Sequence, residues 1–253
     1  MIPVNVRFTL DDYIQKLKED PEILGVFLVG SYATGQYSEL SDIDIKIILK
    51  PTIQKHYKGV KIEDGFHISY SAYSVMEAYD YFYSQLRSYS KFQARMLSQG
   101  IILYDATGEM KHLQAEANLV IQLPFVKPAL SSLQLEAYSL WKYKDALIRN
   151  ELEIHTLKTY HVFLEKALIL YTKLLDMECI FQYPFFKMEQ YIHDAAFRKK
   201  YDIPEFPDIA FLQTYEEGLQ HTTTQKIQQT VHDVFRSIEA QLQIDFEAFE
   251  IRS

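Results

Sequence analysis

The sequence predicts an α+β protein, in which an N-terminal domain with a mixed β-sheet flanked by helices precedes a C-terminal all-α helical bundle. Two observations indicate this class. Short, apolar, β-rich runs occur only before Gly108, and long segments with a hydrophobic period near 3.6 residues follow it. Strands followed by a run of helices are typical of α+β chains. We therefore expect a first domain over residues 1–108 and a helical bundle over residues 109–253.

The first half should open with a helix and then alternate strands with turns. Thr9 is the candidate N-cap of that helix, and Pro21 ends it. The turn Glu63-Asp64-Gly65 lies between two alternating segments, which is typical of a β-hairpin. Apolar or alternating runs predict strands over residues 24–29, 43–49, 60–62, 66–72 and 101–104, and a helix is expected over 79–97.

The second half shows helical periodicity without strand-like runs. Prolines separate its segments, and neither an internal repeat nor a Gly/Ser linker interrupts them. The expected helices cover residues 109–122, 129–150, 155–177, 185–198 and 223–243.

The composition is that of a globular protein, since 48% of the 253 residues are hydrophobic and 24% are charged. No apolar stretch reaches the roughly 18 residues of a membrane span, and the N-terminus has no features of a secretory signal. The single cysteine, Cys179, cannot form an intramolecular disulfide. We expect a cytoplasmic protein with no membrane partner.

The charge disfavours an extended nucleic-acid interface. The net charge is −8, and no run of Lys or Arg residues is available to neutralise a phosphate backbone. A small substrate fits such a surface better.

A candidate site follows the first expected strand. Gly30-Ser31 ends an apolar run, and the missing Cβ of glycine lets the backbone approach a ligand closely. We expect a short helix from Ala33, whose free N–H groups, with the Ser31 hydroxyl, suit a phosphate. Taken alone, however, Gly-Ser is also typical of an ordinary turn.

The next expected strand carries paired carboxylates. The strand period of two puts Asp42 and Asp44 on one face, while Ile43 faces the core. Two close carboxylates repel each other unless a cation lies between them, and hard oxygen ligands suit Mg²⁺ that also bridges triphosphate oxygens. Solvated acids on a half-buried strand are the alternative.

In order and spacing, these residues resemble the nucleotidyltransferase superfamily of the DNA polymerase β type, whose signature is a strand, Gly-Ser, about ten residues, and Asp-hydrophobic-Asp on the adjacent strand. The match covers about the first hundred residues. The helical half is similar in layout to two-domain antibiotic (aminoglycoside or lincosamide) nucleotidyltransferases.

This resemblance implies Mg²⁺-dependent transfer of a nucleoside monophosphate to a hydroxyl of a small molecule, an antibiotic among the options. AMP from ATP is the expected donor chemistry, with another nucleoside triphosphate as the alternative. The resemblance assigns Gly30 and Ser31 to the β- and γ-phosphates, and Asp42 and Asp44 to catalysis and the metal.

One departure concerns the third carboxylate that the superfamily usually carries on a later strand. His67 and Ser69 occupy the corresponding positions. His67 is a candidate general base, because a histidine side chain can take up a proton near neutral pH, and a surface histidine is the alternative. The departure leaves open a nucleotide-binding antitoxin or regulatory protein with weak or no turnover.

A second motif, Arg149-Asn150-x4-His155, resembles the HEPN helical ribonucleases. Surface charge on an amphipathic helix explains the same residues.

The acceptor is expected between residues 30–70 and the helical bundle, because something must keep water from the triphosphate. Residues 111–253 hold 15 basic and 20 acidic residues, which would favour a cationic acceptor such as an aminoglycoside-like sugar. Solvated acidic helix faces explain the count equally well. The sequence leaves open whether the protein forms a homodimer.

Overall fold

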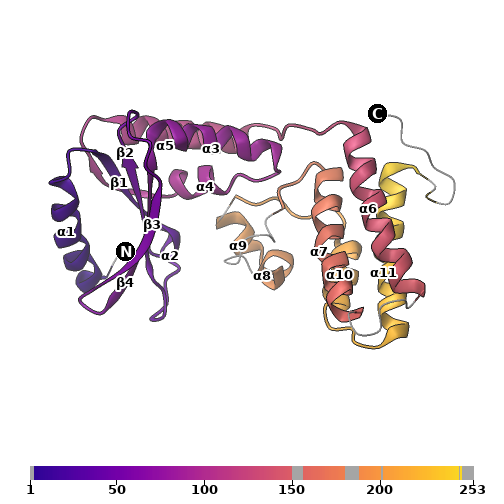
Figure 1. Cartoon of the computed structure of the whole chain (residues 1–253). Coiled ribbons are helices and arrows are strands. Elements are labelled where there is room, and N and C mark those ends of the chain that lie inside the picture. Colours follow the sequence, from indigo (N-terminus) through magenta and orange to yellow (C-terminus); the bar gives the residue numbers. More distant parts are fainter. Residues whose placement is uncertain (1–2, 150–155, 180–187, 201, 245, 247–253) are drawn as a thin grey trace. The chain divides into compact units, whose positions relative to one another are not determined.

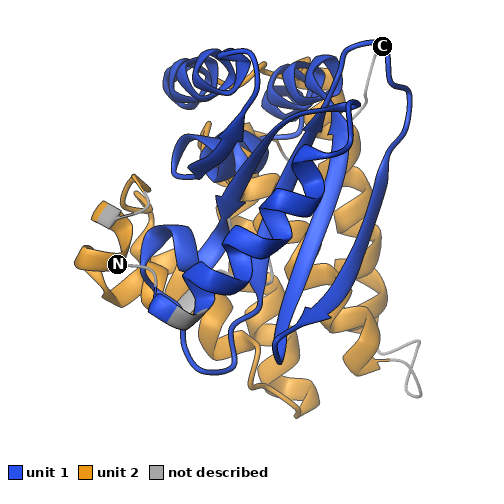
Figure 2. Cartoon of the chain, turned by 90° about the vertical axis from the view of Figure 1, so that its left-hand side faces the viewer, with its two compact units in different colours: residues 1–124 blue, residues 125–253 orange. Residues whose placement is uncertain are grey.

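The computed structural model describes residues 3–149, 156–179, 188–200, 202–244 and 246 (Figure 1). The chain divides into two compact units, which cover residues 1–124 and 125–253 (Figure 2). The first unit combines a sheet with helices, and the described part of the second is helical. The α+β class is therefore confirmed.

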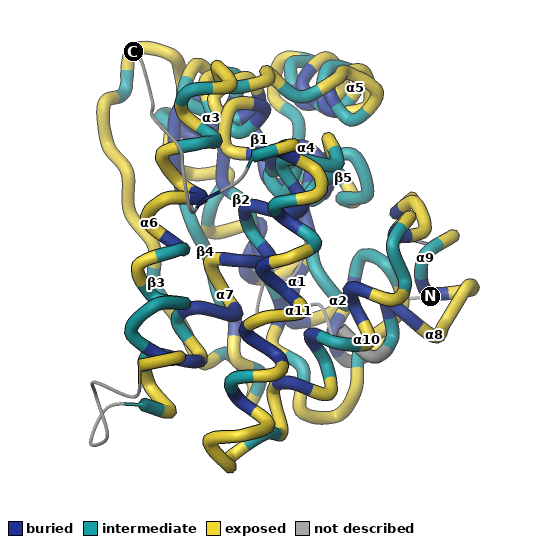
Figure 3. The backbone as a smooth tube through the Cα atoms, turned by 90° about the vertical axis from the view of Figure 1, so that its right-hand side faces the viewer, coloured by how far each residue is buried: buried dark blue, intermediate teal, exposed yellow. Residues whose placement is uncertain are grey.

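The first unit is built on a mixed five-stranded sheet. Its strand order is β3-β4-β2-β1-β5, in which β2 and β4 are parallel and the other neighbours antiparallel. The central strands are buried, whereas β3 at the edge is exposed over most of its length (Figure 3). The strands are β1 (Ile23–Val29), β2 (Ile43–Leu49), β3 (Tyr57–Glu63), β4 (Phe66–Ser74) and β5 (Ile101–Asp105).

Helices cover both faces of this sheet. The helix α1 lies along one face, where alternate β2 residues such as Ile43 and Ile45 pack with Leu10 and Tyr13 (Figure 1). The side chain of Met110 packs so closely on Gly25 of β1, on the other face, that a Cβ there would overlap it. The helices of this unit are α1 (Val4–Lys18), α2 (Gly30–Thr34), α3 (Val75–Arg87), α4 (Phe92–Ser98) and α5 (Glu109–Gln122).

The predictions for the first helix and for residues 79–97 are wrong. Thr9 is not an N-cap, because α1 begins at Val4 and the Thr9 hydroxyl donates instead to Oδ2 of Asp64 at 3.0 Å. The expected helix over 79–97 is two helices, because the chain turns at Tyr89, which has a φ of 55° and a buried side chain. The hairpin turn is confirmed, with left-handed Asp64 and Gly65 between β3 and β4.

The first compact unit extends beyond residue 108, where the hydrophobic pattern changes. The helix α5 packs on α4, β1 and β5, so it belongs with the sheet, and the unit ends at Pro124.

The described residues of the second unit form a hydrophobic core, to which α6, α7, α10 and α11 contribute buried side chains. The helix α10 was not predicted, because its ten residues lie between closely spaced prolines and a glycine. Its N-terminus is capped by Asp208, which accepts from the Phe211 N–H at 2.9 Å. The helices are α6 (Leu130–Arg149), α7 (Thr156–Leu174), α8 (Met188–His193), α9 (Ala195–Lys200), α10 (Ile209–Gly218) and α11 (Thr224–Leu242). Among the described residues, no helix is long and apolar enough to cross a membrane.

Candidate active site

The site begins where the buried strand β1 turns into the short helix α2. Gly30 has a φ of +68°, a left-handed conformation that favours glycine. Since α2 begins at Gly30 and not at the expected Ala33, Ser31 lies in the first turn of this helix. Gly35, with a φ of +72°, ends α2.

The backbone of Gly30 lies directly against the carboxylate of Asp44. Antiparallel pairing aligns Val29 with Asp44, which brings the next residue of the chain, Gly30, beside that side chain. A Cβ built on Gly30 would overlap Oδ2 of Asp44. Both its conformation and this contact therefore require glycine at the end of β1.

The structure brings Asp42 and Asp44 close together, although β2 begins only at Ile43 and Asp42 precedes it. Asp42 is exposed and Asp44 is half-buried. Burial and the neighbouring charge of Asp42 raise the pKa of Asp44 to about 6, against an opposing effect of Lys46. Ionising Asp44 beside Asp42 is thus unfavourable unless a cation compensates.

The residues present fit a divalent cation such as Mg²⁺. This ion is usually held by one or two carboxylates, with substrate phosphates and water completing its octahedron, so a pair of aspartates suffices. The unfavourable charge on Asp44 is what such a cation would relieve. In the part of the chain that is described, no group of three or more His, Cys, Asp or Glu side chains is placed to hold a metal.

The expected position of a third carboxylate holds a serine. Parallel pairing aligns Ser69 of β4 with Asp44. His67, two residues earlier and on the same face, is exposed and pairs with Ile62 of β3. The structure therefore places His67 at the open end of this face, beyond Ser69.

The two acidic residues of the hairpin turn are engaged by α1. Glu63 forms an ion pair with Lys16 at 3.3 Å, and Asp64 accepts from Thr9. Neither is aligned with Asp44 by the strand pairing, so turn chemistry accounts for both.

Lys46 is a residue of this site that the sequence analysis missed. Its Nζ donates to Oγ of Ser71 at 2.8 Å and lies 5.8 Å from the ring centroid of Tyr73. Burial lowers its pKa to about 8, while the charge of Asp44 opposes that shift. The sequence pattern could have identified it, because the strand period of two puts Lys46 on the same face as Asp44.

Of the HEPN-like motif, the structure describes Arg149 alone. Asn150 and His155 lie outside the described residues. Nε of Arg149 donates to Oδ1 of Asp145 at 2.9 Å, one turn earlier on α6. The described part of the motif thus forms an ordinary surface ion pair.

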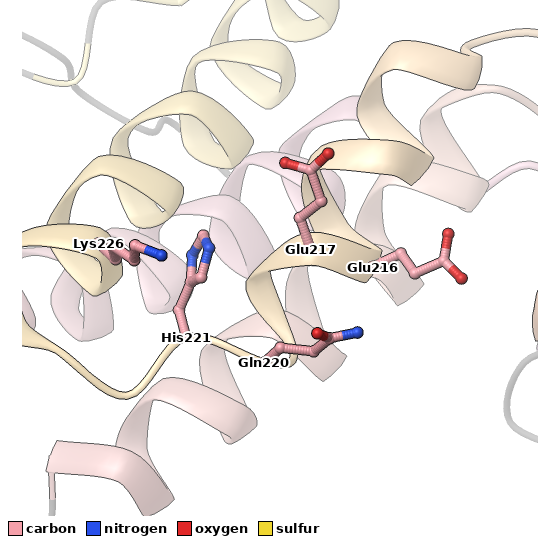
Figure 4. Close-up of a pocket in the computed structure, with 5 residues that line it drawn as sticks. All are labelled: Glu216, Glu217, Gln220, His221 and Lys226. Carbon is pink, nitrogen blue, oxygen red and sulfur yellow. The ribbon is translucent and has the colours of Figure 1, made fainter.

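A separate hollow of about 400 Å³ lies in the second unit, around the end of α10 and the start of α11 (Figure 4). Both signs of charge line it, and Nδ1 of His221 is hydrogen-bonded to Oγ1 of Thr230 at 2.8 Å. None of the residues expected at the active site contributes to it. Its lining residues are Glu216, Glu217, Gln220, His221 and Lys226.

The match to a family model lies within the first unit. Residues 12–109 match the family model "Polymerase beta, Nucleotidyltransferase". A candidate protein adenylyltransferase of Methanocaldococcus jannaschii is 43% identical to this chain over 47 residues, which are 18% of this chain and 48% of that protein. The chain thus spans about half the length of this curated relative. Among solved structures, a nucleotidyltransferase-like protein from Exiguobacterium sibiricum 255-15 is similar at 12% identity and a TM-score of 0.47, over 94% of this chain and 74% of that one.

Proposed function

We propose that this chain, which carries a nucleotidyltransferase domain of the DNA polymerase β superfamily over residues 12–109, transfers a nucleoside monophosphate from a nucleoside triphosphate to a hydroxyl group. The observation that carries the proposal is the contact between the Gly30 backbone and the Asp44 carboxylate, with Asp42 beside it. A strand end, a helix start and a carboxylate pair converge there.

The residues divide into two roles. Gly30 and Ser31 bind the β- and γ-phosphates of the donor through backbone N–H groups and the Ser31 hydroxyl. Asp42 and Asp44 would hold Mg²⁺. When bound, this ion would neutralise charge on the pyrophosphate leaving group. The half-buried setting of Asp44 strengthens its interaction with a bound cation, because fewer water molecules screen it.

ATP is the proposed donor, so that AMP is transferred. The similarity of 47 residues to a candidate protein adenylyltransferase supports an adenine nucleotide. The acceptor is a hydroxyl compound, with a small molecule such as an antibiotic as our first candidate and a protein hydroxyl as the second.

His67 is the proposed general base. It lies on the same face as Ser69 and is open to solvent, so an incoming hydroxyl can reach it. Ser69 itself has no comparable capacity to take a proton at neutral pH.

Transfer is tested by following pyrophosphate release from Mg–ATP over a panel of hydroxyl acceptors, for the wild type, Asp42→Asn and Asp44→Asn. Each substitution keeps the shape of the side chain but removes the charge that holds the metal, so both variants should lose release. Asp12→Asn, at an exposed position on α1, is the matched control and should keep the wild-type rate. Wild-type rates in both site variants would refute the proposal.

A second candidate function is a nucleotide-binding regulatory protein with weak or no turnover. The observation that favours it is Ser69 at the position where a third carboxylate is expected. Tight Mg–ATP binding without pyrophosphate release across acceptors and proteins would support this candidate over the enzyme.

A further inference from the structure

The sheet face that carries Asp44 also carries a row of cationic side chains. Strand pairing aligns Lys46 of β2 with Ser71 of β4, and Ser71 with Lys58 of β3. Directly paired residues point to the same face of a sheet, so this row crosses three neighbouring strands. The hydrogen bond from Lys46 to Ser71, at 2.8 Å, fixes the Lys46 ammonium toward β4. We call Lys46, Ser71 and Lys58 the lysine row.

The lysine row lies at the boundary between a covered and an open part of this face. The next residues along the two central strands on the same face, Ile48 and Tyr73, are buried at 0% and 2% exposure. Lys58, in contrast, is exposed, and no ion pair of Lys58 occurs among the described residues. Asp44 offsets part of the charge of Lys46, so the exposed positive charge of the row is that of Lys58.

Nearer the hairpin turn, this face is uncharged apart from the two aspartates and His67. Val60 and Ile62 of β3 are 62% and 67% exposed, and Ser69 lies between β3 and Asp44. A ligand lying across β3 and β4 would thus meet a small apolar surface together with the lysine row. Beyond the row, next to Tyr73, the described charged group is Glu77, whose carboxylate is paired with His56 at 3.0 Å.

The sheet order puts Ser71 and Lys58 of the lysine row on one side of β2, which carries Asp44 and Lys46, and the proposed phosphate site on the other. β1, which leads into Gly30 and Ser31, neighbours β2 on one side, and β4 with β3 lies on the other. In phosphoryl-type transfer, the attacking and leaving oxygens are roughly in line on opposite sides of the phosphorus. If the leaving phosphates lie at Gly30 and Ser31, the acceptor approaches over β4 and β3.

We propose that the lysine row binds a carboxylate or phosphate group of the acceptor, so that the acceptor is an anionic hydroxyl compound. This inference rests on the proposed function for the position of the donor. It replaces the cationic acceptor that the acidic balance of residues 111–253 favoured, because a net charge does not say where the charged side chains lie.

The test measures binding and does not depend on turnover. The full-length protein is loaded with Mg²⁺ and a nonhydrolysable α,β-methylene analogue of ATP, and then titrated by calorimetry with glucose 6-phosphate, glucose or glucosamine. These probes share one hydroxyl scaffold and differ in charge. Glucose 6-phosphate should bind about tenfold more tightly than glucosamine, because a charge-assisted hydrogen bond contributes on that order.

Three variants locate the site. Lys58→Met and Lys46→Met should each weaken glucose 6-phosphate binding by about tenfold, the loss of one charge-assisted contact. Lys61→Met is the matched control, because Lys61 lies on the same strand but on the other face, with Nζ 5.5 Å from the ring centroid of Tyr13. It should leave the affinity unchanged. Lys58 is exposed, so Lys58→Met tests the row even if Lys46→Met disturbs the fold.

Several outcomes would overturn the inference: equal binding of glucose 6-phosphate and glucosamine, binding of neither, or binding that Lys46→Met and Lys58→Met leave unchanged. Loss of affinity for the ATP analogue in Lys58→Met would assign the row to the donor phosphates and likewise overturn it. If the analogue does not bind at all, the titration is repeated on the unloaded protein. A retained preference for glucose 6-phosphate would then refute the proposed function but support the anion site.

Discussion

The carboxylate of Asp44 lies against the backbone of Gly30, in the space that a Cβ would fill. This contact joins the end of β1 to the start of β2, and Gly30 also has a left-handed conformation. The carboxylate of Asp44 and the backbone that we propose to bind phosphate are thereby held at a fixed mutual position by two buried strands. Such preorganisation is what positioning a triphosphate requires.

Gly30→Ala should abolish Mg–nucleotide binding and destabilise the fold. The added methyl group meets Asp44 in a left-handed conformation that alone costs an L-residue about 1–2 kcal/mol. Gly35→Ala is the matched control, because Gly35 has a similar φ of +72° but nothing within 4 Å of a built Cβ. It should lose stability and keep nucleotide binding, as measured by urea unfolding and calorimetry. Equal nucleotide binding in the two variants would contradict the role of this contact.

Asp44→Asn should stabilise the metal-free protein at neutral pH. The folded-state pKa of Asp44 is raised from 3.8 to about 6. The contribution of Asp44 to the free energy of unfolding is therefore fully present below pH 3.8 and is lost as the pH rises through about 6. Removing the charge should recover about 1–2 kcal/mol at pH 7.5, after allowance for solvent screening. The gain should shrink at pH 4. Thermal unfolding at both pH values, without divalent ions, checks this, and a variant that is less stable than wild type at pH 7.5 would contradict it.

Ser69→Asp should tighten metal binding at the expense of stability. The new carboxylate would be the strand neighbour of Asp44, so it adds an oxygen ligand and raises the pKa of Asp44 further. We expect tighter Mg²⁺ binding by calorimetry and a lower melting temperature in the metal-free state. Ser69→Asn, which adds the same shape without charge, should show neither effect. If both variants behave alike, charge at position 69 does not act on the site.

Thr9→Val should weaken the attachment of the hairpin turn to α1. The substitution keeps the side-chain shape but removes the hydrogen bond to Asp64, which contributes about 1 kcal/mol. Thr52→Val, at an exposed position, controls for the change of side chain. Urea unfolding should show the difference between the two variants, and equal stabilities would show that the hydrogen bond is dispensable.

The sequence predicted those strands and turns whose formation depends on residues close together in the chain. The strand before Gly30, the strand from Ile43 and the turn at Asp64 follow from short-range periodicity and turn chemistry, and all are present. The strand period of two places Asp44 and Lys46 on one face, whereas Asp42 precedes β2 and its position does not follow from that period.

Features that depend on tertiary packing could not be predicted in the same way. Thr9 resembles an N-cap in sequence, but its partner Asp64 is 55 residues away. Gly30 begins α2 with a positive φ, and its close approach to Asp44 is a contact with the neighbouring strand that local patterns do not reveal. Lys46 could have been assigned to the site face, but its contact with Ser71 required knowledge that β2 and β4 are paired.

The central claim, that Gly30, Ser31, Asp42 and Asp44 form one metal–nucleotide site, is tested most directly by paramagnetic broadening. Mn²⁺ is added to ¹⁵N-labelled protein in the presence of the α,β-methylene ATP analogue, and amide signals are followed by NMR. The amides of Gly30, Ser31 and Ser69 should broaden first, and Asp44→Asn should abolish the effect. Broadening centred elsewhere, or unchanged in Asp44→Asn, would contradict the claim.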